Sequence, residues 1–299
     1  MKLGAISFMT DYSIAPDEFA MALEANGFDS FWAGDHTHIP VDPGASGPTM
    51  DPRFGTALQP EYWHLVDPFI ALTYAAAATS TIKLGVGVCM INERDPIILA
   101  KQSASIDHLS NGRFILGIGA GWNEQEMLNH GTNPKTRIKL MRERVEAMRT
   151  IWTNDIAEYH GDLVEFSPMM SWPKPVQPGG PPITIGGNKK NVPRVVAYGD
   201  GWCPSMIALS EEEIVQQVTE FHRLCEEAGR PRLEITAFHV APVADLDVGS
   251  PLEVTQERWD VYQRSGVDRL VIMLPPWRDP NLRLVERYSR FVAGERSTV

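Results

Sequence analysis

The sequence has no long hydrophobic run, little cysteine and no dense cluster of basic residues, and each absence excludes a class of protein. No apolar stretch reaches the ~18 residues that a membrane-spanning helix needs. The N-terminus lacks the layout of a signal peptide, which predicts a cytoplasmic protein. The three cysteines form no C-x-x-C pair, which argues against a zinc ribbon or a thioredoxin-like redox pair. A net charge of −11 disfavours nucleic acid as a partner.

Glycine and aspartate form a local pattern that repeats along the chain and predicts the fold. A helix-like stretch ends in Gly, an Asp follows and an apolar strand begins, as in residues 27–33 and 266–272, with a looser copy in 198–203. Gly accepts the left-handed conformation that ends a helix, and the short loop returns the chain to the sheet. Helices that alternate with buried strands are typical of a mostly parallel sheet.

Eight strands are predicted, and they favour a closed barrel over an open sheet of the Rossmann type, which is the structural alternative. They begin near Lys2, Asp29, Lys83, Arg113, Pro182, Gly201, Leu233 and Arg269. Helices are predicted over residues 16–26, 96–109, 134–152, 211–228 and 253–264. Barrels of this kind have ~250 residues, so residues 1–299 are expected to form one (β/α)8, or TIM, barrel domain.

Two segments interrupt the alternation of strands and helices. Residues 34–63, after the second strand, form a long stretch rich in Pro, Gly and Asp. A structureless segment of this length is usually a lid or a binding loop. Residues 156–182, before the fifth strand, contain a predicted β-hairpin followed by a Pro-rich stretch. Neither insertion has the features of a separate domain.

The active site of such a barrel lies at the C-terminal ends of its strands, which narrows the search. Asp35 and His36 follow the second strand, and His is the usual group for proton transfer near neutral pH. Glycines within the third strand predict the close approach of another backbone or of a planar ligand, with a bulge as the alternative, and those of the fourth predict room for a flat ring system at the barrel mouth. The G-x-G-x-G spacing of the fourth strand does not match a dinucleotide fingerprint. Trp122 follows it, either as a pocket wall or as a core aromatic residue.

The turn after the fifth strand is a candidate anion site. Gly186 and Gly187 precede a predicted helix, and main-chain N–H groups at such a turn bind phosphate in many proteins. Lys189, Lys190 and Arg194 would add positive charge. A strand-to-helix turn with Gly is also common without any ligand, so this segment alone leaves both readings open.

These segments together resemble the luciferase-like monooxygenase superfamily, and within it the oxidoreductases that depend on the deazaflavin coenzyme F420. The most specific piece runs from residues 94–102 through 107–113 to 121–123, and residues 32–36, 182–188 and the predicted hairpin add to it. The resemblance covers roughly residues 1–204 and is weaker beyond. It implies a TIM barrel with the cofactor ring in the barrel mouth, and a homodimer.

The resemblance also implies roles for particular residues. Asp35 and His36 would contact the cofactor ring, and Gly186 and Gly187 would hold its phosphate. A bulge in the third strand, often with a non-prolyl cis peptide, would support the ring at Gly87–Val88. The other residues expected at the cofactor are Gly121, Trp122, Asn123, Asn188 and Arg194. Relatives that oxidise sugar phosphates carry a catalytic Glu where this chain has Trp122, which argues against a sugar-phosphate substrate.

The leading hypothesis is hydride transfer between C5 of the deazaflavin and an unidentified small organic molecule. His36 would move the accompanying proton, Asp35 would bond to the ring edge, and residues 34–63 would exclude water. A flavin or F420 reductase would be the electron source. That loop and residues 273–277, at the end of the eighth strand, suggest an apolar or aromatic substrate.

Two alternatives use the same fold. One is a two-component monooxygenase that takes reduced FMN from a partner reductase and uses oxygen as co-substrate. The other is a metal-dependent hydrolase that uses His36 and His38, whose spacing on a strand would point both rings the same way, with His239 as a further ligand.

Overall fold

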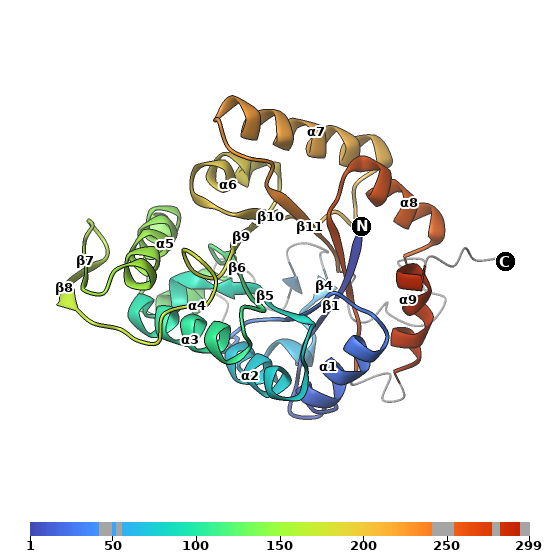
Figure 1. Ribbon diagram of the computed structural model, residues 1–299, viewed down its shortest axis with the longest axis horizontal. Coiled ribbons are helices and arrows are strands. Elements are labelled where there is room, and N and C mark those ends of the chain that lie inside the picture. The colour runs from blue at the N-terminus through green and yellow to red at the C-terminus, as the bar shows by residue number, and fades with distance from the viewer. Residues whose placement is uncertain (42–49, 52–55, 241–253, 277–281, 294–299) are drawn as a thin grey trace.

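The core of the protein is a closed barrel of eight parallel strands, seen in a computed structural model that describes residues 1–41, 50–51, 56–240, 254–276 and 282–293 (Figure 1). The order around the barrel is β1–β12–β11–β10–β9–β6–β5–β2. The strands are β1 (Lys2–Ser7), β2 (Ser30–Ala33), β5 (Lys83–Met90), β6 (Phe114–Gly119), β9 (Ile183–Gly186), β10 (Gly201–Cys203), β11 (Glu234–His239) and β12 (Arg269–Met273). The eight predicted strands and the TIM barrel are confirmed, and the open sheet is excluded.

Helices surround the barrel (Figure 1). They are α1 (Pro16–Ala25), α2 (Pro68–Ala78), α3 (Pro96–Leu109), α4 (Glu124–Asn129), α5 (Arg137–Thr153), α6 (Val192–Tyr198), α7 (Glu211–Glu227), α8 (Gln256–Ser265) and α9 (Arg283–Ala293). The five predicted helices are present. The one expected from residue 134 begins later, because Pro134–Thr136 forms the 3-10 turn η4. Residue 253, the expected start of α8, lies outside the described residues, and the ranges of α2, α4 and α9 were not predicted.

An Asp-Pro pair begins each of the two helices that follow β2 and β5. The Asp67 carboxylate accepts from the N–H groups of Phe69 (2.9 Å) and Ile70 (3.2 Å), and Asp95 does the same for the first turn of α3. Pro at the first helical position loses no hydrogen bond, because that N–H has no partner inside a helix. These caps fix where α2 and α3 begin, close to the rim where the strands end.

The Gly-Asp pattern works as predicted in two of its three copies. Gly27 and Gly266 have φ of +76° and +92°, the left-handed conformation expected after α1 and α8. The looser copy is different: Gly199 has φ −87°, so the prediction of a left-handed residue there is wrong. The aspartates bond the neighbouring strands, since Asp200 accepts from Ile183 N and Asp268 from Ile235 N, both at 2.9 Å.

The glycines inside β5 and β6 make room for the protein's own atoms. A Cβ added at Gly85 would collide with the indole of Trp32, which fills the barrel interior and is fully buried. A Cβ at Gly117 would collide with the carbonyl of Val86 on the neighbouring strand. A group does approach closely at both positions, but it is a core side chain at Gly85, where a backbone or a ligand was expected, and a neighbouring strand at Gly117, where a flat ring was expected.

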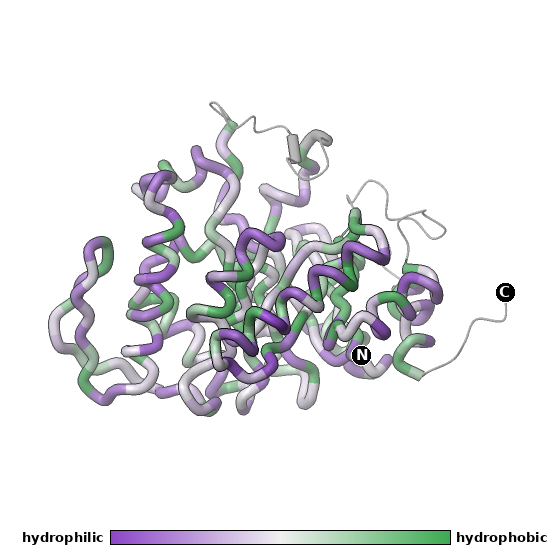
Figure 2. Tube along the Cα trace, turned by 90° about the horizontal axis from the view of Figure 1, so that it is seen from above, coloured by the Kyte–Doolittle hydropathy of each residue, from purple (hydrophilic) through white to green (hydrophobic). Residues whose placement is uncertain are grey.

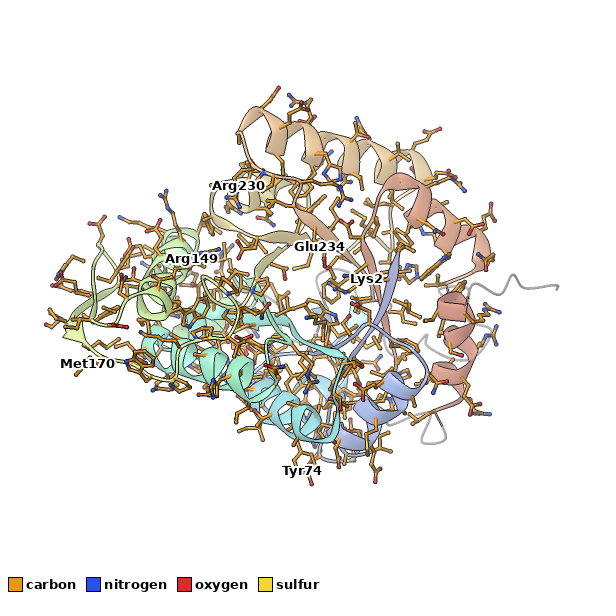
Figure 3. All side chains as sticks on the ribbon, in the orientation of Figure 1. Lys2, Tyr74, Arg149, Met170, Arg230 and Glu234 are labelled. Atoms are coloured by element: carbon orange, nitrogen blue, oxygen red, sulfur yellow. The ribbon has the colours of Figure 1, made fainter. Side chains whose placement is uncertain are left out.

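Both insertions contain short antiparallel pairs. The predicted hairpin is β7 (Ala157–His160) and β8 (Glu165–Met169), which projects beyond α5 and away from the barrel (Figures 1 and 2). Met170, at its end, lies at the outer edge of the molecule (Figure 3). In the first insertion, β3 (Met50–Asp51) pairs with β4 (Thr56–Ala57), followed by the 3-10 turn η2 (Pro60–Tyr62).

In the part of the chain that is described, no helix is long and apolar enough to cross a membrane.

One buried arginine joins the N-terminal ends of three strands. Arg269, at the start of β12, donates to Asp29 Oδ2 at 2.7 Å, to Thr236 Oγ1 at 3.1 Å and to Glu234, and its side chain is 3% exposed. Glu234 and Lys2 both lie at this end of the barrel (Figure 3). The pairs link β12 and β11 to the residue before β2, across the β1–β12 junction where the two ends of the chain meet.

Replacing Arg269 by Met should lower the free energy of unfolding by about 3 kcal/mol, because two carboxylates lose their buried cation. Arg232→Met is the matched control, since Arg232 forms an equally short pair with Asp268 (2.7 Å) but is 54% exposed. We expect it to cost less than about 1 kcal/mol. Urea unfolding measures both, and equal losses would contradict a special role for Arg269.

Candidate active site

A buried ion pair joins the segments that follow the C-terminal ends of β2 and β5. Arg94 donates from Nη2 to Asp35 Oδ1 at 2.6 Å and from Nε to Oδ2 at 3.1 Å, and Met90 N donates to the same Oδ2 at 2.9 Å. Arg94 also bonds Asp67 Oδ2, at the start of α2, at 3.1 Å. Burial alone would lower the pKa of Arg94, but the charge of Asp35 raises it well above its usual value.

This arrangement changes the expected role of Asp35. Its side chain has no exposed surface, and both carboxylate oxygens are already bonded to Arg94 and Met90. A bond from Asp35 to the edge of a cofactor ring is therefore not supported. Asp35 instead ties the loop after β2 to the end of β5, which makes it a positioning residue for its neighbour His36.

His36 is held by a carboxylate from α4, which follows β6, the second strand along the rim from β2. Its Nδ1 lies 2.8 Å from Oε2 of Glu126 in α4, and the two side chains are 6% and 1% exposed. No hydrogen bond of Nε2 occurs among the described residues, so this nitrogen is left for a substrate or cofactor. A carboxylate on Nδ1 orients a catalytic imidazole and fixes which nitrogen carries the proton.

A second carboxyl group, Glu93, lies beside Glu126. It ends the 3-10 turn η3 (Ile91–Glu93) after β5, and its carboxyl is within hydrogen-bonding reach of Glu126. Burial, together with the charges of Glu126 and Asp35, raises the pKa of Glu93 to about 9, against a smaller opposing effect of Arg94. Glu93 is therefore protonated near neutral pH.

Aromatic rings enclose His36. The ring centroids of Tyr62 and Trp122 lie 5.6 Å and 5.7 Å from that of His36, and Tyr62 also meets Phe8 edge to face at 4.9 Å. Tyr62 belongs to the first insertion, so part of the predicted lid lies over the candidate base. Residues 42–49 and 52–55 of that insertion lie outside the described residues. Trp122 packs against the barrel-interior cluster and also borders His36; its role as a pocket wall stays a prediction.

The two neighbouring histidines do not form a metal site with His36. His38 Nε2 lies 2.8 Å from Asn129 Nδ2, and its Nδ1 lies 3.0 Å from Thr37 Oγ1. The strand spacing assumed for His36 and His38 does not apply, because β2 ends at Ala33; His36 bonds Glu126 and His38 bonds Asn129, further along α4. His239 Nδ1 is 3.0 Å from the hydroxyl of Tyr262. Within the described residues, no three His, Cys, Asp or Glu side chains come together to hold a metal.

The third strand has the bulge and the cis peptide that the resemblance implied. The Gly87–Val88 bond is cis, and the pairing of β5 with β6 shifts register between Val86 and Cys89. A Cβ added at Gly119 would lie 2.9 Å from Val88 Cγ2, and one at Gly186 would lie 3.3 Å from Val88 Cγ1. Val88 therefore joins the ends of β5, β6 and β9 at one place on the rim.

The predicted anion site lies at the end of β9. Gly187 is exposed with φ +113°, a conformation that favours glycine, and its carbonyl accepts from Trp202 Nε1 at 3.1 Å. Asn188 caps the 3-10 turn η5 (Lys189–Asn191) through Lys190 N, and Arg194 bonds the side chain of Asn191. Asn188 and both lysines are exposed, so positive charge does border this turn.

Gly121 and Asn123 shape the start of α4. Gly121 has φ +83°, and a Cβ there would lie 3.6 Å from Glu93 Oε1. Asn123 is buried and caps α4 by accepting from Glu126 N at 3.3 Å, while its Nδ2 has no partner among the described residues. Sequence reasoning gave no role to Glu93 and left the direction of Glu126 open. The N-cap spacing from Asn123 predicts only that Glu126 lies in the first turn.

The site can now be compared with known proteins. The family model of the luciferase-like monooxygenases matches residues 17–248. The chain belongs to this family. Its membership supports an enzyme of the oxidoreductase or monooxygenase kind.

Three relatives show the range of the family around this chain. An uncharacterized protein of Mycobacterium tuberculosis is 38% identical over 90% of this chain and 94% of its own length. The F420-dependent glucose-6-phosphate dehydrogenase of Amycolatopsis mediterranei is 30% identical over 86% and 76%. The oxygenase component of the flavin-dependent trigonelline monooxygenase of Acinetobacter baylyi is 29% identical, but over only 60% and 51%.

A solved structure shows the same fold. It is that of an F420-dependent secondary alcohol dehydrogenase in complex with an F420-acetone adduct, with a TM-score of 0.73, 18% identity and coverage of 99% of both chains. At this identity the likeness establishes the barrel architecture. The family therefore contains proteins that use F420 and proteins that use flavin, and membership alone does not choose between them.

Asp35→Asn should lower the free energy of unfolding by about 3 kcal/mol, because the buried Arg94 guanidinium loses its buried carboxylate and keeps only the more exposed Asp67. Glu124→Gln is the matched control: it removes one carboxylate charge from the exposed Glu124–Arg137 pair, at a cost below about 1 kcal/mol. Chemical unfolding of the two variants compares them. A loss in Asp35→Asn no larger than in the control would refute the structural role of this ion pair.

Proposed function

We propose that this protein is an F420-dependent oxidoreductase that transfers a hydride between the deazaflavin and a small organic substrate at the C-terminal face of the barrel. The observation that carries the proposal is the geometry of His36, a ring held on Nδ1 by Glu126 with Nε2 left without a described partner. His36 would accept or donate the proton that accompanies hydride transfer. Trp122, at the place of the acid in the sugar-phosphate dehydrogenases, argues against a sugar-phosphate substrate.

The residues present fit a planar cofactor with a phosphate. Trp122 and Tyr62 supply aromatic surface beside His36, and Asn123 has a buried amide nitrogen with no described partner. We infer that Gly87, Val88, Gly121, Trp122 and Asn123 border the ring, and that Gly186, Gly187, Asn188 and Arg194 border the phosphate. The bound deazaflavin would supply the hydride acceptor or donor. The protein's part is to orient the substrate, to exclude water and to move one proton at Nε2 of His36.

The family description and the trigonelline monooxygenase favour a second candidate, a two-component monooxygenase that uses reduced FMN. His36 would then act next to a flavin and oxygen would be consumed, with a partner reductase as the electron source. The two candidates share the barrel and the histidine, and they differ in which cofactor binds.

Titration of the purified protein with oxidised F420 and, separately, with FMN tests the choice, followed by cofactor fluorescence. We expect saturable binding of F420 at lower concentration than FMN. Tighter binding of FMN would support the two-component monooxygenase instead of the F420-dependent oxidoreductase. Binding of neither would refute the redox assignment.

Replacing His36 by Ala should lower the rate of hydride transfer about 100- to 10,000-fold, the usual contribution of a positioned acid or base, with a much smaller change in F420 affinity. His160→Ala is the control, because His160 lies exposed in the β7–β8 hairpin, far from the rim. Stopped-flow reduction of the cofactor with a panel of small alcohols reports the rate. An unchanged rate in His36→Ala would remove this residue from the mechanism.

A further inference from the structure

Two carboxyl groups are buried side by side behind His36, without a cation between them. Glu93 and Glu126 are 8% and 1% exposed, and they come from η3 and α4, on neighbouring parts of the rim. The guanidinium of Arg94 directs its described hydrogen bonds to Asp35 and Asp67, and that of Arg144 bonds the carbonyl of Ile91. Neither forms a described ion pair with Glu93 or Glu126.

Each carboxyl group also has an oxygen with no donor. Glu126 Oε2 bonds His36, but Glu126 Oε1 is buried and has no partner among the described residues, and the same holds for Glu93 Oε2. A buried carboxylate without donors is costly, and two like charges in contact cost more. One proton placed between the two groups removes both problems, because a protonated carboxyl is a donor and carries no charge.

We propose that Glu93 and Glu126 share one proton, and that this proton lets Glu126 act as the single negative charge that holds His36 with its own proton on Nδ1. The shared proton follows from the buried pair itself, whereas its use in catalysis rests on the proposed function. Glu93 is a positioning residue here, since it acts on His36 only through Glu126.

The protons on His36, Glu126 and Glu93 can be followed through one catalytic step. When Nε2 of His36 accepts a proton from the substrate, the imidazolium gains one positive charge and faces the one negative charge of Glu126. Glu93 keeps its proton throughout, and Nε2 returns the accepted proton to solvent or product. Without the Glu93 proton, the pair would carry two negative charges beside a neutral ring.

Burial and the two neighbouring carboxylates favour the proton on Glu93, whereas the guanidinium groups of Arg94 and Arg144 oppose it. Burial, Glu126 and Asp35 raise the pKa of Glu93, and Arg94 opposes them. Four further titratable groups face the pair: Cys89 on β5, Arg144 on α5, His130 at the end of α4, and His36 itself. Of these, the pKa of the Cys89 thiol is raised by burial, and the pKa of His130 is lowered by burial and by His38, so both groups are neutral near pH 7.

The first test measures the melting temperature against pH without any cofactor. The pKa of Glu93 is higher in the folded state (about 9) than in the unfolded chain (about 4.5), so its protonated form stabilises the fold fully below about pH 4.5. That stabilisation is lost as the pH rises towards 9. Glu93→Gln should therefore gain in melting temperature relative to the wild type between about pH 5 and 9, whereas Glu124→Gln, on α4, should follow the wild type. Parallel curves for all three proteins would overturn the proposal.

The second test detects the proton directly and needs no stable variant. Infrared spectra of the wild type near pH 7 should contain the C=O band of a buried protonated carboxyl, shifted in D2O, and Glu93→Gln should lack it. The 15N shifts of His36 should show its proton on Nδ1, and Glu126→Gln should populate the Nε2–H form. Absence of the carboxyl band in the wild type refutes the shared proton.

The two proposals fail separately. If the carboxyl band and the tautomer are as expected but no cofactor binds, the shared proton stands and the redox function falls. If F420 binds and turns over but the band is absent, the function stands and the shared proton falls. With both intact, the pH dependence of kcat distinguishes a positioning role from a structural one, since only a positioning role predicts that Glu93→Gln loses the alkaline change in kcat seen in the wild type.

Discussion

The buried pair of Asp35 and Arg94 is the interaction on which the rest of the site depends. It joins the end of β2 to the residue after η3, and Met90 N and Asp67 complete the coordination of the two charges. A buried carboxylate and guanidinium are tolerated only when nearly all their polar atoms have partners, and here each has at least three bonds. The backbone leaving β2 is thereby fixed, and the next residue, His36, is directed towards α4.

The distribution of charge at the rim follows from this pair. Asp35 and Asp67 share the one guanidinium, and Glu126 has the imidazole of His36. Glu93 is the acid that remains: it forms no ion pair among the described residues, although Arg94 and Arg144 act on it electrostatically, and it lies within reach of Glu126. A protein that buries more carboxyl groups than cations must protonate one of them, because the desolvation of an unpaired charge exceeds the cost of binding a proton.

Local sequence patterns predicted the architecture well, because each pattern has a local physical cause. The Gly-Asp turns and the proline-led helices depend on the conformations of single residues. The predicted first residues of all eight strands agree with the structure to within one residue. The sequence also predicted that Asp35 and His36 follow the end of the second strand. The family resemblance predicted the bulge at Gly87–Val88.

The contacts inside the site were not predictable in the same way. His36 and Glu126 are 90 residues apart, and Asp35 and Arg94 are 59 apart, so only closure of the barrel brings them together. The glycines of β5 and β6 led to a different error. A glycine in a strand indicates that another group approaches closely, but it does not identify that group. At Gly85 the approaching group is Trp32, a side chain of the core, where a ligand was the other option.

The position of Glu126 bears on the expectation about sugar phosphates. The family resemblance implies an acid directly after the glycines of the fourth strand in sugar-phosphate dehydrogenases, and this chain has the indole of Trp122 there. Here the carboxylate lies in the first turn of α4 and reaches Nδ1 of His36 from the protein side. Under the proposed function, an acid in that place orients the base and does not itself meet the substrate. Trp122 and Tyr62 then border the base, so the proposal favours a substrate that exchanges one proton and is otherwise apolar or aromatic.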